Sequence, residues 1–167
     1  MTTQHPLVDM LIDHYLQSAP GVFITSGVME NPAPVSVNHL YATYRGNKVL
    51  TKEGRAYRDG LSAVIARSSN EWKIAVDDVY QKGRGAVLVI GLYFETLANA
   101  SWQPGNRTKS GKLQEPRKTQ DSANYIKIIE DAVKSGCGID DCNNMVHLVY
   151  KAEDKLRPRT EVIYIVA

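Results

Sequence analysis

The stretch "AVLVIGLYF", residues 86–94, decides the fold, because its nine residues are apolar or glycine without interruption. Its β-branched and aromatic residues favour a strand, and the lack of polar alternation predicts burial on both faces. The run is far shorter than a membrane span. Two later stretches, "MVHLVYKA" (145–152) and "EVIYIVA" (161–167), predict two further strands, which we expect "EDKLRPR" (153–159) to join as a hairpin.

The segments upstream of residue 86 predict two helices and two strands. Residues 51–68 place Tyr57 and other apolar residues on one helical face, and residues 47–51 and 21–28 have strand composition. Residues 6–17 repeat apolar residues at the spacing of an amphipathic helix. We therefore expect an N-terminal helical arm over residues 1–20 and one domain over 21–167.

Length and composition are those of a single globular domain. The chain has 167 residues, of which 43% are hydrophobic and 23% charged, which argues against a disordered or fibrous protein. The net charge is only +2, so nucleic-acid binding would depend on local clusters of cations. The N-terminus lacks a signal-peptide pattern, and we expect a cytoplasmic protein. Cys137 and Cys142 match no zinc or disulfide spacing, and the four histidines show no ligand spacing.

Residues 99–120 form the one clearly basic segment. It is polar and contains glycine and proline, and Glu115 is its only acid. Two interpretations stay open from composition: a solvated loop, or a loop that contacts DNA phosphates. Its cations are Arg107, Lys109, Lys112, Arg117 and Lys118.

Acidic residues flank a predicted helix that begins near Ser122. Asp121 is placed to cap this helix, and Lys127 lies one turn beyond position 123 on the same face. The helix ends at "KSGCG", and the following loop contains Asp140 and Asp141, which could fold back towards the start of the helix. Carboxylates that converge on one point usually bind a hard divalent cation such as Mg²⁺ or Mn²⁺, which suits phosphodiester cleavage. The simpler alternative is a helix cap and a solvated turn.

Two separated blocks resemble the RusA family of Holliday junction resolvases, small endonucleases common in phages. The first is "VNHLYATYRGNKVLTKEGRAYRDGL" (37–61), similar to the family's early asparagine, tyrosine-rich strand and helix start. The second is "DSANYIKIIEDAVKSGCGIDD" (121–141), similar to its D-x-D-N-x-x-K helix and DD loop. The resemblance implies a compact α+β (α/β) domain with a mixed β-sheet and two main helices. It also implies a homodimer that binds four-way junctions and nicks them symmetrically with Mg²⁺.

The resemblance also implies roles for individual residues. Asp121, Asp140 and Asp141 would bind metal, and Asp121, Asp141 and Lys127 would take part in catalysis. The residues expected to contact DNA match the two blocks and the basic residues just before the second. They are Asn38, Arg45, Arg58, Arg117, Lys118, Asn124 and Lys127. Tyr57 also matches the pattern, but its place on an apolar face favours core packing.

Position 123 departs from the family pattern, because Ala123 stands where the family has its second catalytic aspartate. Ser122 points about 100° around the helix, and Glu130 lies about 10 Å further along it, so neither is an easy substitute. The rest of the motif is intact, which favours a deliberate Asp-to-Ala change made to trap an inactive nuclease over a natural, degenerate member of the family. The alternative is a protein that binds branched DNA without cutting it, and a third interpretation is a purely structural domain.

Overall fold

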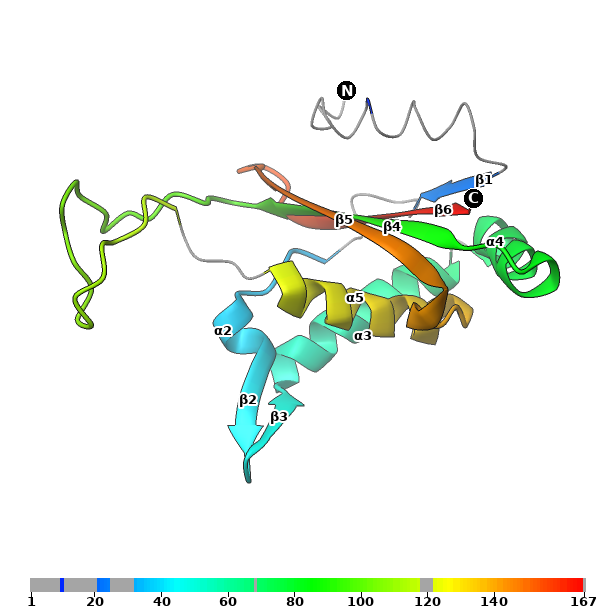
Figure 1. Ribbon diagram of the computed structural model, residues 1–167, viewed down its shortest axis with the longest axis horizontal. Helices are drawn as coiled ribbons and strands as arrows, with labels where there is room; N and C mark the ends of the chain where they lie inside the picture. The colour runs from blue at the N-terminus through cyan, green and yellow to red at the C-terminus, as the bar shows by residue number, and fades with distance from the viewer. Residues whose placement is uncertain (1–9, 11–20, 25–31, 68, 118–121, 167) are drawn as a thin grey trace.

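A computed structural model describes residue 10 and residues 21–24, 32–67, 69–117 and 122–166. Its centre is a four-stranded sheet with two long helices packed against one face, and a small hairpin and a long arm project from this body (Figure 1). The strands are β1 (Gly21–Ile24), β2 (Tyr41–Tyr44), β3 (Asn47–Leu50), β4 (Ala86–Phe94), β5 (Asn144–Glu153) and β6 (Arg159–Val166). The helices are α2 (Val37–Leu40), α3 (Lys52–Arg67), α4 (Ser69–Lys82), α5 (Ser122–Cys137) and the 3-10 turn η1 (Asp141–Asn143).

Strand β4 is the centre of the sheet, as its sequence predicts. The strand order is β1-β6-β4-β5, with β4 parallel to β5 and antiparallel to β6. Every residue of β4 is buried. The sheet is therefore mixed, and the predicted α+β architecture is confirmed.

The predicted hairpin between the last two strands is wrong. Strands β5 and β6 do not pair with each other, because β4 lies between them and pairs with both. A β5–β6 hairpin would leave one edge of the apolar strand β4 without hydrogen-bond partners. The connection instead crosses the end of β4, where Asp154 N donates to Phe94 O at 2.8 Å. Buried Arg159 holds this crossing by pairing with Asp154 at 2.6 Å and with Glu161 at 2.8 Å.

Helices α3 and α5 cover one face of the sheet. Their apolar faces meet the alternate residues of β4 and β6 that point towards them, which makes one continuous core. The helices come close at Gly136, where an added Cβ would lie 2.8 Å from Ser62 O and from Ile65 Cγ2. Tyr57 belongs to this core, as expected, and its hydroxyl hydrogen-bonds Thr160 Oγ1 at 2.6 Å.

Helix α4 is an element that the sequence interpretation missed. Its sequence, "SNEWKIAVDDVYQK", does carry a helical signal, because apolar residues stand at 72, 76 and 79 after a serine suited to capping. Val79 is buried in the core and Tyr80 is exposed. The structure thus has a third long helix within the described residues, beside the two that were predicted.

Two parts project from the body (Figure 1). Strands β2 and β3 form an antiparallel hairpin, which includes the tyrosine-rich strand implied by the resemblance. Residues 97–117 form an extended arm with bridges between Ala98 and Arg117 and between Arg107 and Leu113. The predicted N-terminal arm lies outside the described residues apart from residue 10, and so do residues 25–31. None of the helices in the described ranges is long and apolar enough to cross a bilayer.

Candidate active site on helix α5 and the following turn

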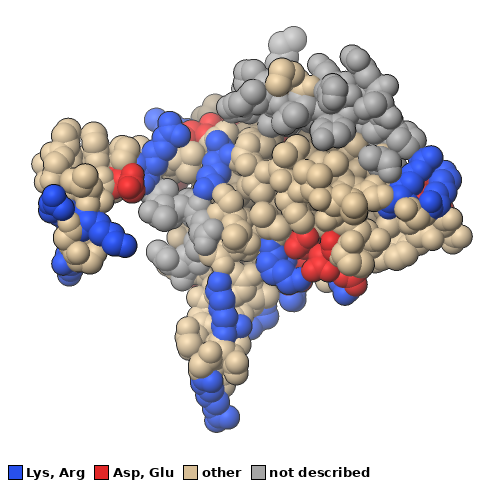
Figure 2. Space-filling view, viewed as in Figure 1, with Lys and Arg blue, Asp and Glu red and all other residues tan. Residues whose placement is uncertain are grey.

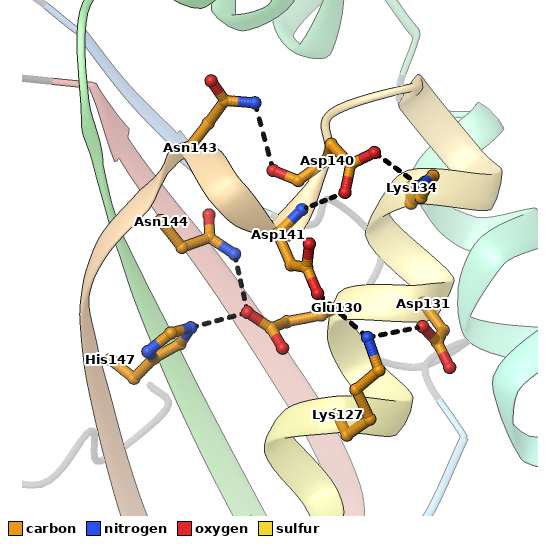
Figure 3. Close-up of polar contacts among 9 residues, drawn as sticks. All are labelled: Lys127, Glu130, Asp131, Lys134, Asp140, Asp141, Asn143, Asn144 and His147. Atoms are coloured by element: carbon orange, nitrogen blue, oxygen red, sulfur yellow. Dashed lines mark hydrogen bonds and ion pairs between the residues drawn. The ribbon is translucent and has the colours of Figure 1, made fainter.

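Helix α5 has one apolar face and one charged face, and this difference positions the candidate site. Tyr125, Ile128, Ile129, Ala132 and Val133 are buried against the sheet and α3. Apart from Glu130, which is also buried, the charged residues of the helix lie on the other face, because helical side chains three and four positions apart share a face. Lys127, Asp131 and Lys134 therefore line the outer side of the helix (Figure 3).

The turn after α5 brings two aspartates back beside the helix. Gly138 adopts a φ of +85°, and its N–H donates to Lys134 O at 2.9 Å, which ends the helix as glycine commonly does. Ile139 is then buried and fixes the direction of the chain. Asp140 caps η1 by accepting from Asp141 N at 2.8 Å. The two acidic side chains thus have defined positions.

Two lysines of α5 pair with these acids (Figure 3). Lys127 Nζ lies 2.9 Å from Asp141 Oδ2 and 3.3 Å from Asp131 Oδ1. Lys134 pairs with Asp140. The hydrogen bond to Asp141 is the main cause that raises the pKa of Lys127, and the same bond lowers the pKa of Asp141. Asp141 reaches the Lys127 side chain, which also contacts Asp131 one turn further along the helix, and Asp140 faces the last turn; these contacts do not extend to the first turn, towards which the sequence suggested that both acids could fold back.

Only part of the predicted metal-binding set lies within the described residues. Asp121 and Lys118 lie outside the described residues. Ala123 is described, and it is exposed on the first turn of α5, one turn before Lys127. Within the described part of the chain, no group of three or more His, Cys, Asp or Glu side chains could hold a metal ion. Asp140 and Asp141 supply carboxylate oxygens, which are the donors that Mg²⁺ and Mn²⁺ prefer, so this pair suits such an ion but does not complete its coordination.

Glu130 makes its contacts away from position 123 and does not take the place of a carboxylate there. Its carboxylate is buried and accepts from Asn144 Nδ2 at 3.0 Å, and it lies 2.7 Å from His147 Nε2 (Figure 3). These contacts join α5 to the start of β5. No histidine was assigned a role from sequence, and His147 is a structural partner of Glu130 here.

Tyr80 supports the acidic turn from α4, and sequence reasoning missed it. Its hydroxyl donates to Gly138 O at 3.2 Å and accepts from Asp140 N at 3.2 Å and Asn143 Nδ2 at 3.4 Å. One hydroxyl thereby contacts three points of the turn. The sequence did carry a signal for the helix, since Val79 and Tyr80 follow Val76 at spacings of three and four residues. It carried no signal for the contacts of Tyr80, because its partners are about 60 residues away along the chain.

The β2–β3 hairpin also contacts helix α5. Lys48 Nζ donates to Asn124 Oδ1 at 2.6 Å and lies 4.4 Å from the ring centre of Tyr41. Burial raises the pKa of Tyr41, the charge of Asp131 adds to this effect, and the charge of Lys127 opposes it. The hairpin therefore stands directly beside the charged face of α5. Lys48 and Tyr41 were not predicted as site residues.

The other residues predicted to contact DNA are spread over the molecule. Arg45 lies at the tip of the hairpin, and Arg117 lies at the base of the projecting arm. Arg58 lies on α3 and pairs with Asp59 at 2.7 Å. Asn38 belongs to α2, and its side chain is outside the described residues. Figure 2 shows basic side chains on both projecting parts.

The comparisons with known proteins agree with this arrangement. The family model of the endodeoxyribonuclease RusA matches residues 31–164, which include the hairpin, α3, the central strand, α5 and the acidic turn. No curated protein matches the chain. Because the match covers most of the chain, the protein belongs to the RusA family of endodeoxyribonucleases.

Proposed function

We propose that this protein is a Mg²⁺-dependent endonuclease that resolves Holliday junctions and related branched DNA by paired nicks, present here in an inactive Asp-to-Ala form at position 123. Membership of the RusA family supports a Holliday junction endonuclease in general, and RusA resolvases generally depend on divalent metal ions. The observation that carries the finer proposal is the position of Ala123 beside an otherwise intact set of motif residues. This set combines Asn124 and Lys127 on α5 with Asp140 and Asp141 on the turn.

The position of Ala123 suits a catalytic carboxylate. Residues 123 and 127 are one turn apart and share a helical face, with a rise of about 6 Å between them. Lys127 on that face contacts Asp141 at 2.9 Å. An aspartate at 123 would thus be directed to the side of the helix to which Asp141 returns.

The proposed metal ligands are Asp121, Asp140 and Asp141, with the carboxylate absent at 123 as a further ligand. A bound Mg²⁺ would polarise the scissile phosphate and lower the pKa of an attacking water. Lys127 would contribute a positive charge beside the phosphate, held in place by Asp141 and Asp131. Tyr80 and the cap on η1 would keep the two turn aspartates in position.

Paired nicks on a junction with two-fold symmetry require two matched sites, so we propose a homodimer. The proposed contacts to the DNA backbone are made by Arg45 on the hairpin, Arg58 on α3, Arg117 at the base of the arm, Asn38 on α2, and Lys118, which lies outside the described residues. Residues 1–20 would form an arm separate from the endonuclease domain at 21–167. These assignments rest on the resemblance and on the positions of the described residues.

The decisive experiment restores the carboxylate. Ala123→Asp should cleave a four-way junction in Mg²⁺, and Ala123→Asn should not, because the amide has nearly the same shape without the charge. The change should be tolerated by the fold, since α5 has no acidic residue in its first turn and an aspartate there interacts favourably with the helix dipole. Without metal, Ala123→Asp should bind junctions more weakly than the unaltered chain because of repulsion by the phosphates.

The second candidate is a protein that binds branched DNA without cutting it, and Ala123 is the observation that favours it. The same experiment separates the two. If Ala123→Asp remains folded and binds junctions but does not cut them with Mg²⁺ or Mn²⁺, the nuclease proposal is wrong. If neither form prefers junctions to linear duplex, both candidates are wrong.

A further inference from the structure

The tip of the β2–β3 hairpin carries an aromatic and a cationic side chain that the fold does not use. Within the described residues, the two strands pair only with each other, and residues 42–49 are all exposed. Tyr44 is 60% exposed, and the guanidinium of Arg45 lies 5.3 Å from the centre of its ring. A large aromatic ring beside a guanidinium at the end of a projecting hairpin offers a ligand both a flat apolar face and a positive charge.

The turn itself is unusual in sequence. Tyr44 pairs with Asn47, and the two residues between them adopt positive φ angles, 50° at Arg45 and 80° at Gly46. Such two-residue turns favour asparagine followed by glycine, because a side chain with Cβ is disfavoured in the left-handed region. Arginine therefore stands where backbone preference alone would select asparagine, which suggests that its side chain has a use.

The hairpin is fixed to the body of the protein at its base and also through Lys48, which pairs with Thr43 one position from the tip. Lys48 Nζ donates to Asn124 Oδ1 at 2.6 Å, and Arg55 Nη1 donates to Leu50 O at 2.7 Å. The backbone N–H of Thr51 donates to Leu40 O at 3.0 Å. The tip is consequently held at a set distance from α5.

The distance from the base of the hairpin to its tip corresponds to the length of a few stacked nucleotides. Tyr44 lies three residues beyond Tyr41, which is about 10 Å along a strand. Nucleotides in a stacked strand are about 3.4 Å apart, so the tip would meet DNA about three nucleotides from the part that passes Tyr41, whose hydroxyl senses the charges of Asp131 and Lys127 on α5. In continuous duplex, each base is covered on both faces by its neighbours. At a branch point this stacking is interrupted, and a base face becomes accessible to an aromatic or guanidinium plane.

We propose that Tyr44 and Arg45 form a stacking tip that binds an exposed base at the branch point and thereby distinguishes branched DNA from linear duplex. The proposal rests on the proposed function, since it requires that the chain bind branched DNA. Tyr44 supplies the flat apolar face, and Arg45 supplies a second plane and a positive charge near the backbone. The selectivity for branches would then come from the hairpin rather than from the catalytic acids.

The test uses the unaltered chain without metal, so that no cleavage occurs. A four-way junction carries 2-aminopurine at its branch point, and a linear duplex carries it in the same sequence; fluorescence and affinity are measured for both. Tyr44→Leu should weaken junction binding by about 5- to 150-fold and remove the fluorescence change, while duplex binding stays the same. Tyr44→Trp should retain both. Leu156→Ala, which removes another exposed apolar side chain, is the matched control and should have no effect.

The outcomes separate the two proposals. If the unaltered chain does not prefer the junction, the proposed function itself is wrong. If it does prefer the junction but Tyr44→Leu binds and fluoresces like the unaltered chain, the stacking tip is wrong and the function stands. An equal loss of affinity for junction and duplex would also overturn the stacking tip, because it would indicate an ordinary backbone contact. Thermal unfolding of each variant checks that the fold is intact.

Discussion

Lys127 is the cation that contacts an acid of the helix and an acid of the turn in the candidate site. It contacts Asp141 at 2.9 Å and Asp131 at 3.3 Å, and its positive charge opposes the repulsion between acids on the helix and the turn. The motif predicted the position of Lys127 because residues one turn apart share a helical face. The second partner was not predicted from the motif, although Asp131 lies four residues further along the same helix.

We predict that Lys127→Met raises the pKa of Asp141 towards its ordinary value of 3.8. The hydrogen bond from Lys127 is the largest cause that lowers this pKa, and the charge of Lys134 is the smallest named cause, so Lys134→Met should raise it less. Because the folded pKa is depressed, the stabilisation from this pair is present above the ordinary pKa and is lost as the pH falls through the folded value. Carboxyl-carbon NMR titration measures both shifts. An unchanged Asp141 pKa in Lys127→Met would contradict the pairing.

At the scale of elements, the sequence predicted the positions of most helices and strands well, but it predicted poorly which of them pair with each other. Strand β4 and helices α3 and α5 were predicted because their apolar patterns are long and regular. The β5–β6 hairpin was predicted wrongly because sequence proximity was taken for pairing, whereas β4 needed a partner on each edge. The contacts of Tyr80 and Lys48 could not be predicted, since each joins residues about 60 or more positions apart.

The crossing of α3 and α5 positions the candidate site, and glycine makes it possible. We predict that Gly136→Ala destabilises the protein by about 1–3 kcal/mol, because its Cβ would lie 2.8 Å from Ser62 O, a backbone atom that moves only with its helix. Gly60→Ala on α3 is the matched control. Its Cβ would have no neighbour closer than 3.8 Å, so we expect a gain of about 0.5–1 kcal/mol from helix propensity. Urea unfolding measures both, and equal effects of the two changes would argue against a close helix crossing.

At the scale of the whole molecule, positive charge is concentrated on the parts that project. Residues 99–117 contain four cations and one acid, a net charge of +3, whereas the whole chain carries only +2. The arm has almost no buried residues. It is ordered instead by hydrogen bonds such as Gln114 N to Asn106 O at 2.8 Å and Trp102 Nε1 to Gln114 O at 3.1 Å. The arm is ordered although it has no core of its own, and it carries several cations. We therefore favour the interpretation that it contacts DNA phosphates over the interpretation that it is only a solvated loop.

We therefore predict that replacing Arg107, Lys109 and Lys112 together with glutamine weakens binding to junctions and to linear duplex alike. Phosphate contacts carry no information about branching, and each releases counterions. The slope of log K against log salt concentration should become shallower by about 0.9 for each phosphate that is no longer neutralised, or by up to about 3. Lys73→Gln, on α4 at the opposite end of the molecule from the arm, should leave the slope unchanged (Figure 1). A weakening confined to junctions would assign branch recognition to the arm and remove the reason to place it in the hairpin.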